Sequence, residues 1–141
     1  MSRVFWDTMM FIYLLEGHEE YSDRVEELLN RSRRRRDTLL SSHLALGELM
    51  AGSERIDRPQ KIAGVQRTLK EMGFSFLAFD QGAVKPFSLL RGREKLGTAD
   101  SIHLACAASA EIDLFLTGDK RLTKLDVPGI QFIVDFNSPI L

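Results

Sequence analysis

The feature that most constrains the fold of this chain is an alternation between two kinds of segment. Short apolar runs, rich in residues that favour strands, are separated by longer segments in which apolar residues recur with helical spacing. Strands joined by helical crossovers predict an α/β fold with a largely parallel sheet covered on both faces. Such sheets bind ligands beyond the carboxyl ends of their strands, so residues that follow the strands are the first candidates for function.

The segments can be assigned from these patterns. The strand candidates are residues 3–6, 38–42, 74–79, 113–117 and 130–134. The helix candidates are residues 8–16, 19–35, 43–52, 59–72, 80–96 and 98–111. We expect Gly52 to close the third helix, and Pro86 and Gly92 to kink or break the fifth.

The composition indicates one globular domain, residues 1–141, with 44% hydrophobic and 28% charged residues. The apolar runs are too short to cross a bilayer, and the N-terminus lacks the arrangement of a signal peptide. A single cysteine, Cys106, excludes an internal disulfide framework and fits a reducing compartment. We therefore expect a cytoplasmic protein without a membrane segment. The net charge of −1 does not by itself point to a polyanionic partner.

Four carboxylates stand out from the rest. Asp7 interrupts an apolar stretch directly after the first strand, where an ionised side chain is costly unless its charge is compensated. Asp119 lies two residues past the fourth strand, and Glu48 lies among leucines on the helix after the second. Asp100 lies near the start of a helix for which Thr98 is a suitable N-cap, at about the second helical position.

If these four side chains converge, their mutual repulsion requires a counter-charge. A hard divalent cation such as Mg²⁺ or Mn²⁺ prefers oxygen ligands, and it suits hydrolysis of phosphate esters. Taken singly, Asp119 also fits a turn residue, Asp100 a helix-start acid and Glu48 a partly exposed helix residue. The residues alone thus indicate an acidic metal site without establishing that the four acids meet.

The sequence resembles the PIN-domain family, and in particular the VapC-type ribonuclease toxins of prokaryotic toxin–antitoxin pairs. The matching segments are VFWDTMMFIYLLEG, LLSSHLALGELMAG and LGTADSIHLACAASAEIDLFLTGDKRL, which together with the closing strand cover nearly the whole chain. In order, they supply the acids of the family as Asp7, Glu48, Asp100 and Asp119. Met9 stands where the family often has a small polar residue, which removes one supporting hydrogen bond.

The resemblance implies a three-layer α/β/α sandwich around a mainly parallel sheet of four to five strands. It implies hydrolysis of RNA phosphodiester bonds and Mg²⁺ or Mn²⁺ in a metal site of Asp7, Glu48, Asp100 and Asp119, in which the three aspartates bind the ion directly or through water. Glu48 would complete the pocket and activate water, and Thr117 would help to order it. The implied partners are the RNA substrate, a cognate antitoxin protein and a second copy of the chain in a homodimer.

The other basic and titratable residues of interest are an arginine-rich run, Lys120, Arg121 and His103. The run RSRRRR, residues 31–36, fits a solvated helix end that complements the helix dipole, or a contact to RNA or a partner. Lys120 and Arg121, beside Asp119, are better placed to contact a scissile phosphate. His103, three residues after Asp100, is expected to pack behind the site rather than act as a base or ligand.

Three other functions remain open at this point. The first is a catalytically silent PIN fold that only binds RNA or protein. The second is a receiver-like Mg²⁺-binding signalling module, but Asp7 lacks the acidic neighbour that such a module needs. A dehalogenase-type phosphatase would require an aspartate at the position that Met9 occupies.

Overall fold

The computed structural model describes residues 1–55 and 59–141, and the side chains outside residues 53–63. The strands are β1 (Arg3–Trp6), β2 (Thr38–Ser42), β3 (Phe74–Leu77), β4 (Ile112–Thr117) and β5 (Ile130–Asp135). The helices are α1 (Thr8–Leu15), α2 (Ser22–Arg35), α3 (His43–Arg55), α4 (Pro59–Glu71), α5 (Gln81–Gly92) and α6 (Thr98–Ser109), with a short 3₁₀ helix η1 (Leu122–Lys124).

The five strands form one sheet in the order β3-β2-β1-β4-β5, and all four pairings are parallel. β1 lies at the centre, in register with β2 on one side and β4 on the other. The predicted α/β fold with a mainly parallel sheet is therefore confirmed. The carboxyl ends of β1, β2 and β4, which precede Asp7, α3 and Asp119, meet at one edge of the sheet.

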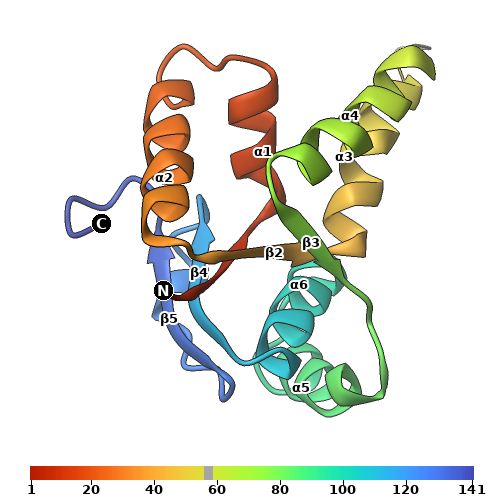
Figure 1. Ribbon diagram of the computed structural model, residues 1–141. Helices are drawn as coiled ribbons and strands as arrows, with labels where there is room; N and C mark the ends of the chain where they lie inside the picture. Colours follow the sequence, from red (N-terminus) through yellow and green to blue (C-terminus); the bar gives the residue numbers. More distant parts are fainter. Residues whose placement is uncertain (56–58) are drawn as a thin grey trace.

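Helices cover both faces of the sheet, as Figure 1 shows, with α1 to α4 on one side and α5 and α6 on the other. The central strand explains why both faces must be covered. Val4 and Trp6 of β1 point into the core beneath α1 to α4, whereas Phe5 points into the core beneath α5 and α6. All three side chains are fully buried, so the sheet is the middle layer of a three-layer sandwich.

The close packing of α6 against the sheet and against the turn before β5 depends on small residues. Ala105, Ala107 and Ala108 of α6 are buried, and Ala108 lies against the turn that leads into β5. Gly129 in that turn has φ +99°, and a Cβ at this position would overlap the backbone carbonyl of Ala108. Glycine is therefore required here both for its backbone conformation and for its lack of a side chain.

Several predicted boundaries need correction. Gly52 does not close its helix, because α3 continues to Arg55. Pro86 lies within α5 and does not break it, whereas Gly92 is its last residue. Ile62, one of the apolar residues whose helical spacing predicts the helix over residues 59–72, lies outside the described side chains.

The predicted N-cap of α6 is also wrong. Gly97 occupies that position, with no side-chain capping bond. Thr98 is instead the first helical residue, and Asp100 is the third.

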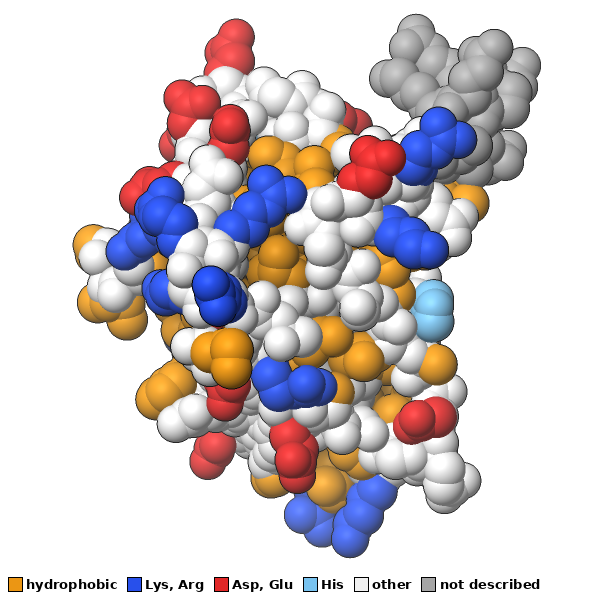
Figure 2. All heavy atoms as spheres, viewed as in Figure 1, with side chains coloured by type: hydrophobic (Ala, Val, Ile, Leu, Met, Phe, Trp, Pro, Cys, Tyr) orange, Lys and Arg blue, Asp and Glu red, His pale blue; other side chains and the backbone are white. Residues whose placement is uncertain are grey.

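The arginine-rich end of α2 lies at the opposite edge of the sheet from the candidate acids. β2 begins at Thr38, just after this run, and Glu48 follows the other end of the same strand. The first turn of α2 carries Asp23 and its last turn carries Arg33, Arg34 and Arg35. Figure 2 shows this separation, with acidic side chains over the upper part of α2 and basic ones over its lower part. The charges thus complement the helix dipole.

Candidate metal-binding site

Asp7 is held at the centre of the sheet edge by its neighbours. Its backbone N–H donates to the carbonyl of Leu116 at 3.0 Å, which continues the pairing of β1 with β4 beyond the strand. Its side chain is the N-cap of α1 and accepts the Thr8 N–H at 2.9 Å. The other carboxylate oxygen accepts a hydrogen bond from the Thr117 hydroxyl at 2.8 Å. These bonds compensate part of the cost of burying a residue that is only 9% exposed.

Thr117 connects this carboxylate to the next candidate. It is the last residue of β4, it is fully buried, and its hydroxyl oxygen also accepts the backbone N–H of Asp119 at 3.0 Å. One hydroxyl therefore positions Asp7 and the backbone of Asp119 together. The expectation that Thr117 orders the pocket agrees with this geometry.

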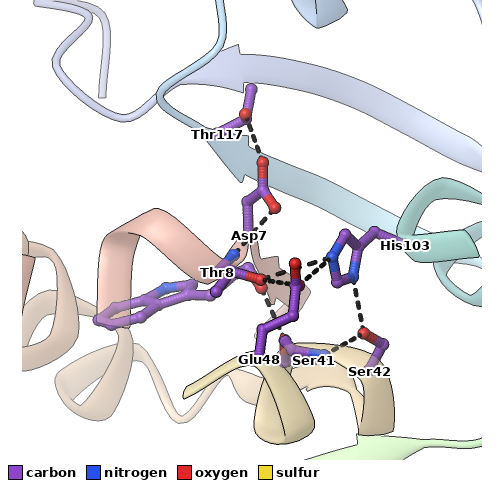
Figure 3. Close-up of polar contacts among 9 residues, drawn as sticks. Asp7, Thr8, Ser41, Ser42, Glu48, His103 and Thr117 are labelled. Atoms are coloured by element: carbon purple, nitrogen blue, oxygen red, sulfur yellow. Dashed lines mark hydrogen bonds and ion pairs between the residues drawn. The ribbon is translucent and has the colours of Figure 1, made fainter. Parts of the chain in front are cut away.

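Glu48 joins the same edge through α3. Its Oε1 accepts a hydrogen bond from the Thr8 hydroxyl at 2.8 Å and lies 2.9 Å from His103 Nε2. Figure 3 shows the Glu48 side chain reaching from α3 toward Thr8, and the His103 ring pointing between Glu48 and Ser42. Thr8 thus connects Glu48 to the residue that follows Asp7 in the chain.

The proton positions in this network follow from the donors present. The Ser42 hydroxyl oxygen accepts the Ala45 N–H at 3.0 Å and lies 2.7 Å from His103 Nδ1. Because the Glu48 carboxylate can only accept, a neutral His103 ring carries its proton on Nε2, and its Nδ1 accepts the hydrogen of the Ser42 hydroxyl. That Nε2–H donates to Glu48. His103 is 3% exposed, as expected for a residue packed behind the site.

The carboxyl of Asp100 lies close enough to Asp7 and Asp119 for their charges to affect its pKa. Burial raises the pKa of its carboxyl, and the negative charges of Asp7 and Asp119 raise it further. His103 and Arg121 lower this pKa and offset part of the effect. Negative charge therefore accumulates where α6 begins and β1 and β4 end, which is the condition that attracts a cation.

Asp119 is already paired in this arrangement. The Arg121 guanidinium donates to both of its carboxylate oxygens, at 3.1 and 2.7 Å. This hydrogen bonding lowers the pKa of Asp119 below its usual value. Arg121 therefore contacts a candidate metal ligand, and its side chain is 83% exposed.

The described side chains do not form a ready coordination shell, since no three of their His, Cys, Asp and Glu groups are placed to share one metal ion. Their chemistry nevertheless fits Mg²⁺ or Mn²⁺, because every candidate ligand is a carboxylate and the charges of three of them repel. Arg121 neutralises one of the candidate ligands, Asp119, and would compete with a cation for it.

Sequence reasoning missed two residues of this site. Thr8 and Ser42 are buried polar residues whose hydroxyls hold Glu48 and His103. Thr8 lies two residues past the end of β1, and Ser42 is the last residue of β2. Their positions at the ends of buried strands were the available signal. Met9, in contrast, is 42% exposed on α1 and makes no part of the described network.

The fold and the site together define a three-layer α/β/α protein with an acidic cluster at the carboxyl ends of its central strands. The family model of the PIN domain matches residues 4–128, and the chain therefore belongs to the PIN domain family. No curated protein matches the chain.

Several solved structures share the fold. VapBC2 from Rickettsia felis, bound to a DNA fragment from its promoter, is similar with a TM-score of 0.72 and 14% identity, over 94% of this chain and 97% of that chain. A toxin–antitoxin complex from Klebsiella pneumoniae is similar with a TM-score of 0.64 and 20% identity, over 90% and 94%. VapBC-5 from Mycobacterium tuberculosis is similar with a TM-score of 0.63 and 20% identity, over 96% and 99%. At these identities the likeness concerns the fold.

Proposed function

We propose that this protein is a metal-dependent endoribonuclease that hydrolyses RNA phosphodiester bonds as the toxin of a toxin–antitoxin pair. Membership of the PIN domain family supports a nuclease. The observation that carries the proposal is the proximity of Asp7 and Asp119 to the partly buried carboxyl of Asp100 at the sheet edge, which supports a shared cation site.

The roles of the residues follow from their positions. Asp7, Asp100 and Asp119 would hold a Mg²⁺ or Mn²⁺ ion, with Asp7 fixed by Thr117. A bound divalent cation neutralises these carboxylates and stabilises the negative charge that develops on the phosphate. Glu48, oriented by Thr8 and His103, would accept a proton from the attacking water. Lys120 and Arg121 would approach the phosphate from the residues after Asp119.

The same family membership favours a nuclease over a receiver-like module. A catalytically silent PIN fold is the remaining alternative, and the pairing of Asp119 with Arg121 is the observation that favours it. RNA binding without cleavage would identify that alternative.

Partners are part of the proposal. The similar structures are described as VapBC or toxin–antitoxin complexes, which supports a cognate antitoxin for this chain. We also propose a homodimer that acts on cytoplasmic RNA. Among the helices that the structure describes, none combines the length and the apolar character needed to cross a bilayer. Growth arrest on expression, relieved by the product of a neighbouring reading frame, would support the toxin role.

The test of the activity compares wild type, Asp7→Asn and Asp126→Asn on a panel of RNAs in Mg²⁺, in Mn²⁺ and in EDTA. Asp126 is an exposed acid that precedes β5 and therefore lies at the other edge of the sheet, so it controls for the loss of one charge. We expect wild type and D126N to cut RNA only with a divalent cation, and D7N to keep its fold but not cut. Cleavage by D7N at the wild-type rate would contradict the proposal.

A further inference from the structure

A cavity of about 410 Å³ lies beside the candidate catalytic residues and is not used by them. Tyr13 and Tyr21, from α1 and the start of α2, line one part of it, and Phe136, Asn137 and neighbouring residues after β5 line another. Gly118 and Lys120 complete the lining, and they are the two residues that flank Asp119 in the chain. Because consecutive Cα atoms are about 3.8 Å apart, the cavity borders the acidic edge directly.

The aromatic part of the lining is a packed unit. The ring centroids of Tyr13, Tyr21 and Phe136 are 5.0 to 5.5 Å apart. The chain after β5 is fixed in place by Arg24, whose guanidinium donates to the carbonyls of Phe136 at 3.2 Å and Ser138 at 2.9 Å. The lining is therefore held in place by the packing of the three rings and by the hydrogen bonds from Arg24 to the backbone after β5.

Gly118 lies close to the aromatic rings of the cavity on the side of Asp119. A Cβ at this position would lie 3.4 Å from the Phe136 ring and 3.9 Å from the Tyr13 hydroxyl oxygen. The turn that carries Asp119 thus passes close to the aromatic rings. A ligand group in the cavity would be next to a phosphate held by the acidic edge.

The lining carries one basic and one acidic side chain, Lys120 and Asp135, beside its aromatic rings. Among the described residues, Lys120 forms no salt bridge, whereas Arg121 beside it is paired with Asp119. Asp135 is the one acid of the lining, and its carboxylate accepts the Asn137 N–H at 3.0 Å. Aromatic rings, a free ammonium group and hydrogen-bonding groups together match a base and its phosphate. The volume lies within the range of pockets that hold small organic ligands.

We propose that this cavity is a nucleotide subsite, which receives a base of single-stranded RNA and the phosphate next to the bond to be cut. The inference rests on the proposed ribonuclease function and adds the position at which the substrate is held. Tyr13 contributes the ring surface, and Lys120 contributes the charge that contacts the phosphate.

The test uses an end-labelled, short single-stranded RNA, whose Kd is measured by fluorescence anisotropy in EDTA over a range of salt concentrations. We expect Y13L to raise the Kd about tenfold and Y13F, which keeps the ring, to restore most of the lost affinity. K120M should weaken binding and reduce the slope of log Kd against log salt by about 0.7. Lys124, an exposed lysine of η1 that does not line the cavity, gives the matched control K124M.

Two further measurements separate this inference from the proposed function. In Mg²⁺, the Tyr13 variants should raise KM with little change in kcat, and thiouridine in the RNA should crosslink to the cavity residues. If wild type cuts RNA while Y13L and K120M behave like K124M, the subsite is wrong and the ribonuclease stands. If wild type neither binds nor cuts RNA, both proposals are overturned.

Discussion

The Thr117 hydroxyl donates a 2.8 Å hydrogen bond to Asp7 across the neighbouring strands β4 and β1. The same oxygen accepts the Asp119 N–H, so one buried side chain sets the relation between two of the candidate metal ligands. The parallel pairing of β1 with β4 makes this possible because it brings the ends of both strands to the same edge of the sheet.

Replacing Thr117 by valine should therefore lower the free energy of unfolding by about 1–3 kcal/mol, because a buried carboxylate oxygen and a backbone N–H each lose a partner. Thr117→Ser keeps the hydroxyl and should retain most of this stability. Urea denaturation of the two variants measures the difference. Equal stability of T117V and T117S would show that the hydroxyl does not hold the site together.

His103 should matter for activity through Glu48. His103→Gln places an amide N–H where Nε2 donates to Glu48, whereas His103→Asn is too short to reach it. We expect H103N to lower kcat about tenfold or more relative to H103Q, at similar stability. Thermal melts and steady-state cleavage rates check this together. Equal rates for the two variants would mean that Glu48 needs no support from His103.

The raised pKa of Asp100 predicts how the metal-free protein responds to pH. Between the ordinary carboxyl pKa of 3.8 and the raised value, the folded state binds more protons than the unfolded state. The free energy of unfolding should therefore fall as pH rises through this window. Asp100→Asn should remove this part of the pH dependence, and D126N should keep it. Denaturation curves in EDTA at several pH values give the comparison, and identical profiles for D100N and wild type would contradict the charge cluster.

Cys106 should be unreactive in the folded protein. Burial, with a smaller effect from the charge of Asp80, raises the pKa of its thiol to about 11, and the side chain is 2% exposed. Since the thiolate is the reactive species, iodoacetamide should modify Cys106 at neutral pH only after unfolding. Mass spectrometry with and without urea measures this. Modification of the native protein at the unfolded rate would show that α6 opens readily.

The sequence predicted the fold well because its apolar runs match strands that are buried on both faces. Asp7 was conspicuous for the same reason, since a charge directly after such a strand needs a partner. The contacts of Glu48 with Thr8 and His103 were not predictable, because the three residues lie on elements whose separation is set by tertiary packing. Helix ends such as those near Gly52 and Thr98 were misplaced by one to three residues, since local capping preferences are weak beside packing.

The pairing of Asp119 with Arg121 was the other feature that spacing did not predict. The sequence places both residues in one turn and predicts that Arg121 contacts the scissile phosphate. In the structure its guanidinium is directed at the carboxylate instead. The two roles are compatible if a cation displaces the guanidinium from Asp119.

The most direct test of the account is a crystal structure of the protein grown with Mn²⁺, with the metal located by its anomalous scattering. We predict a Mn²⁺ ion within about 2.0–2.2 Å of carboxylate oxygens of Asp7, Asp100 or Asp119, with the Arg121 guanidinium moved away from Asp119. Manganese bound elsewhere, or no manganese at this edge in a preparation that cuts RNA, would contradict the claim that these acids share one cation.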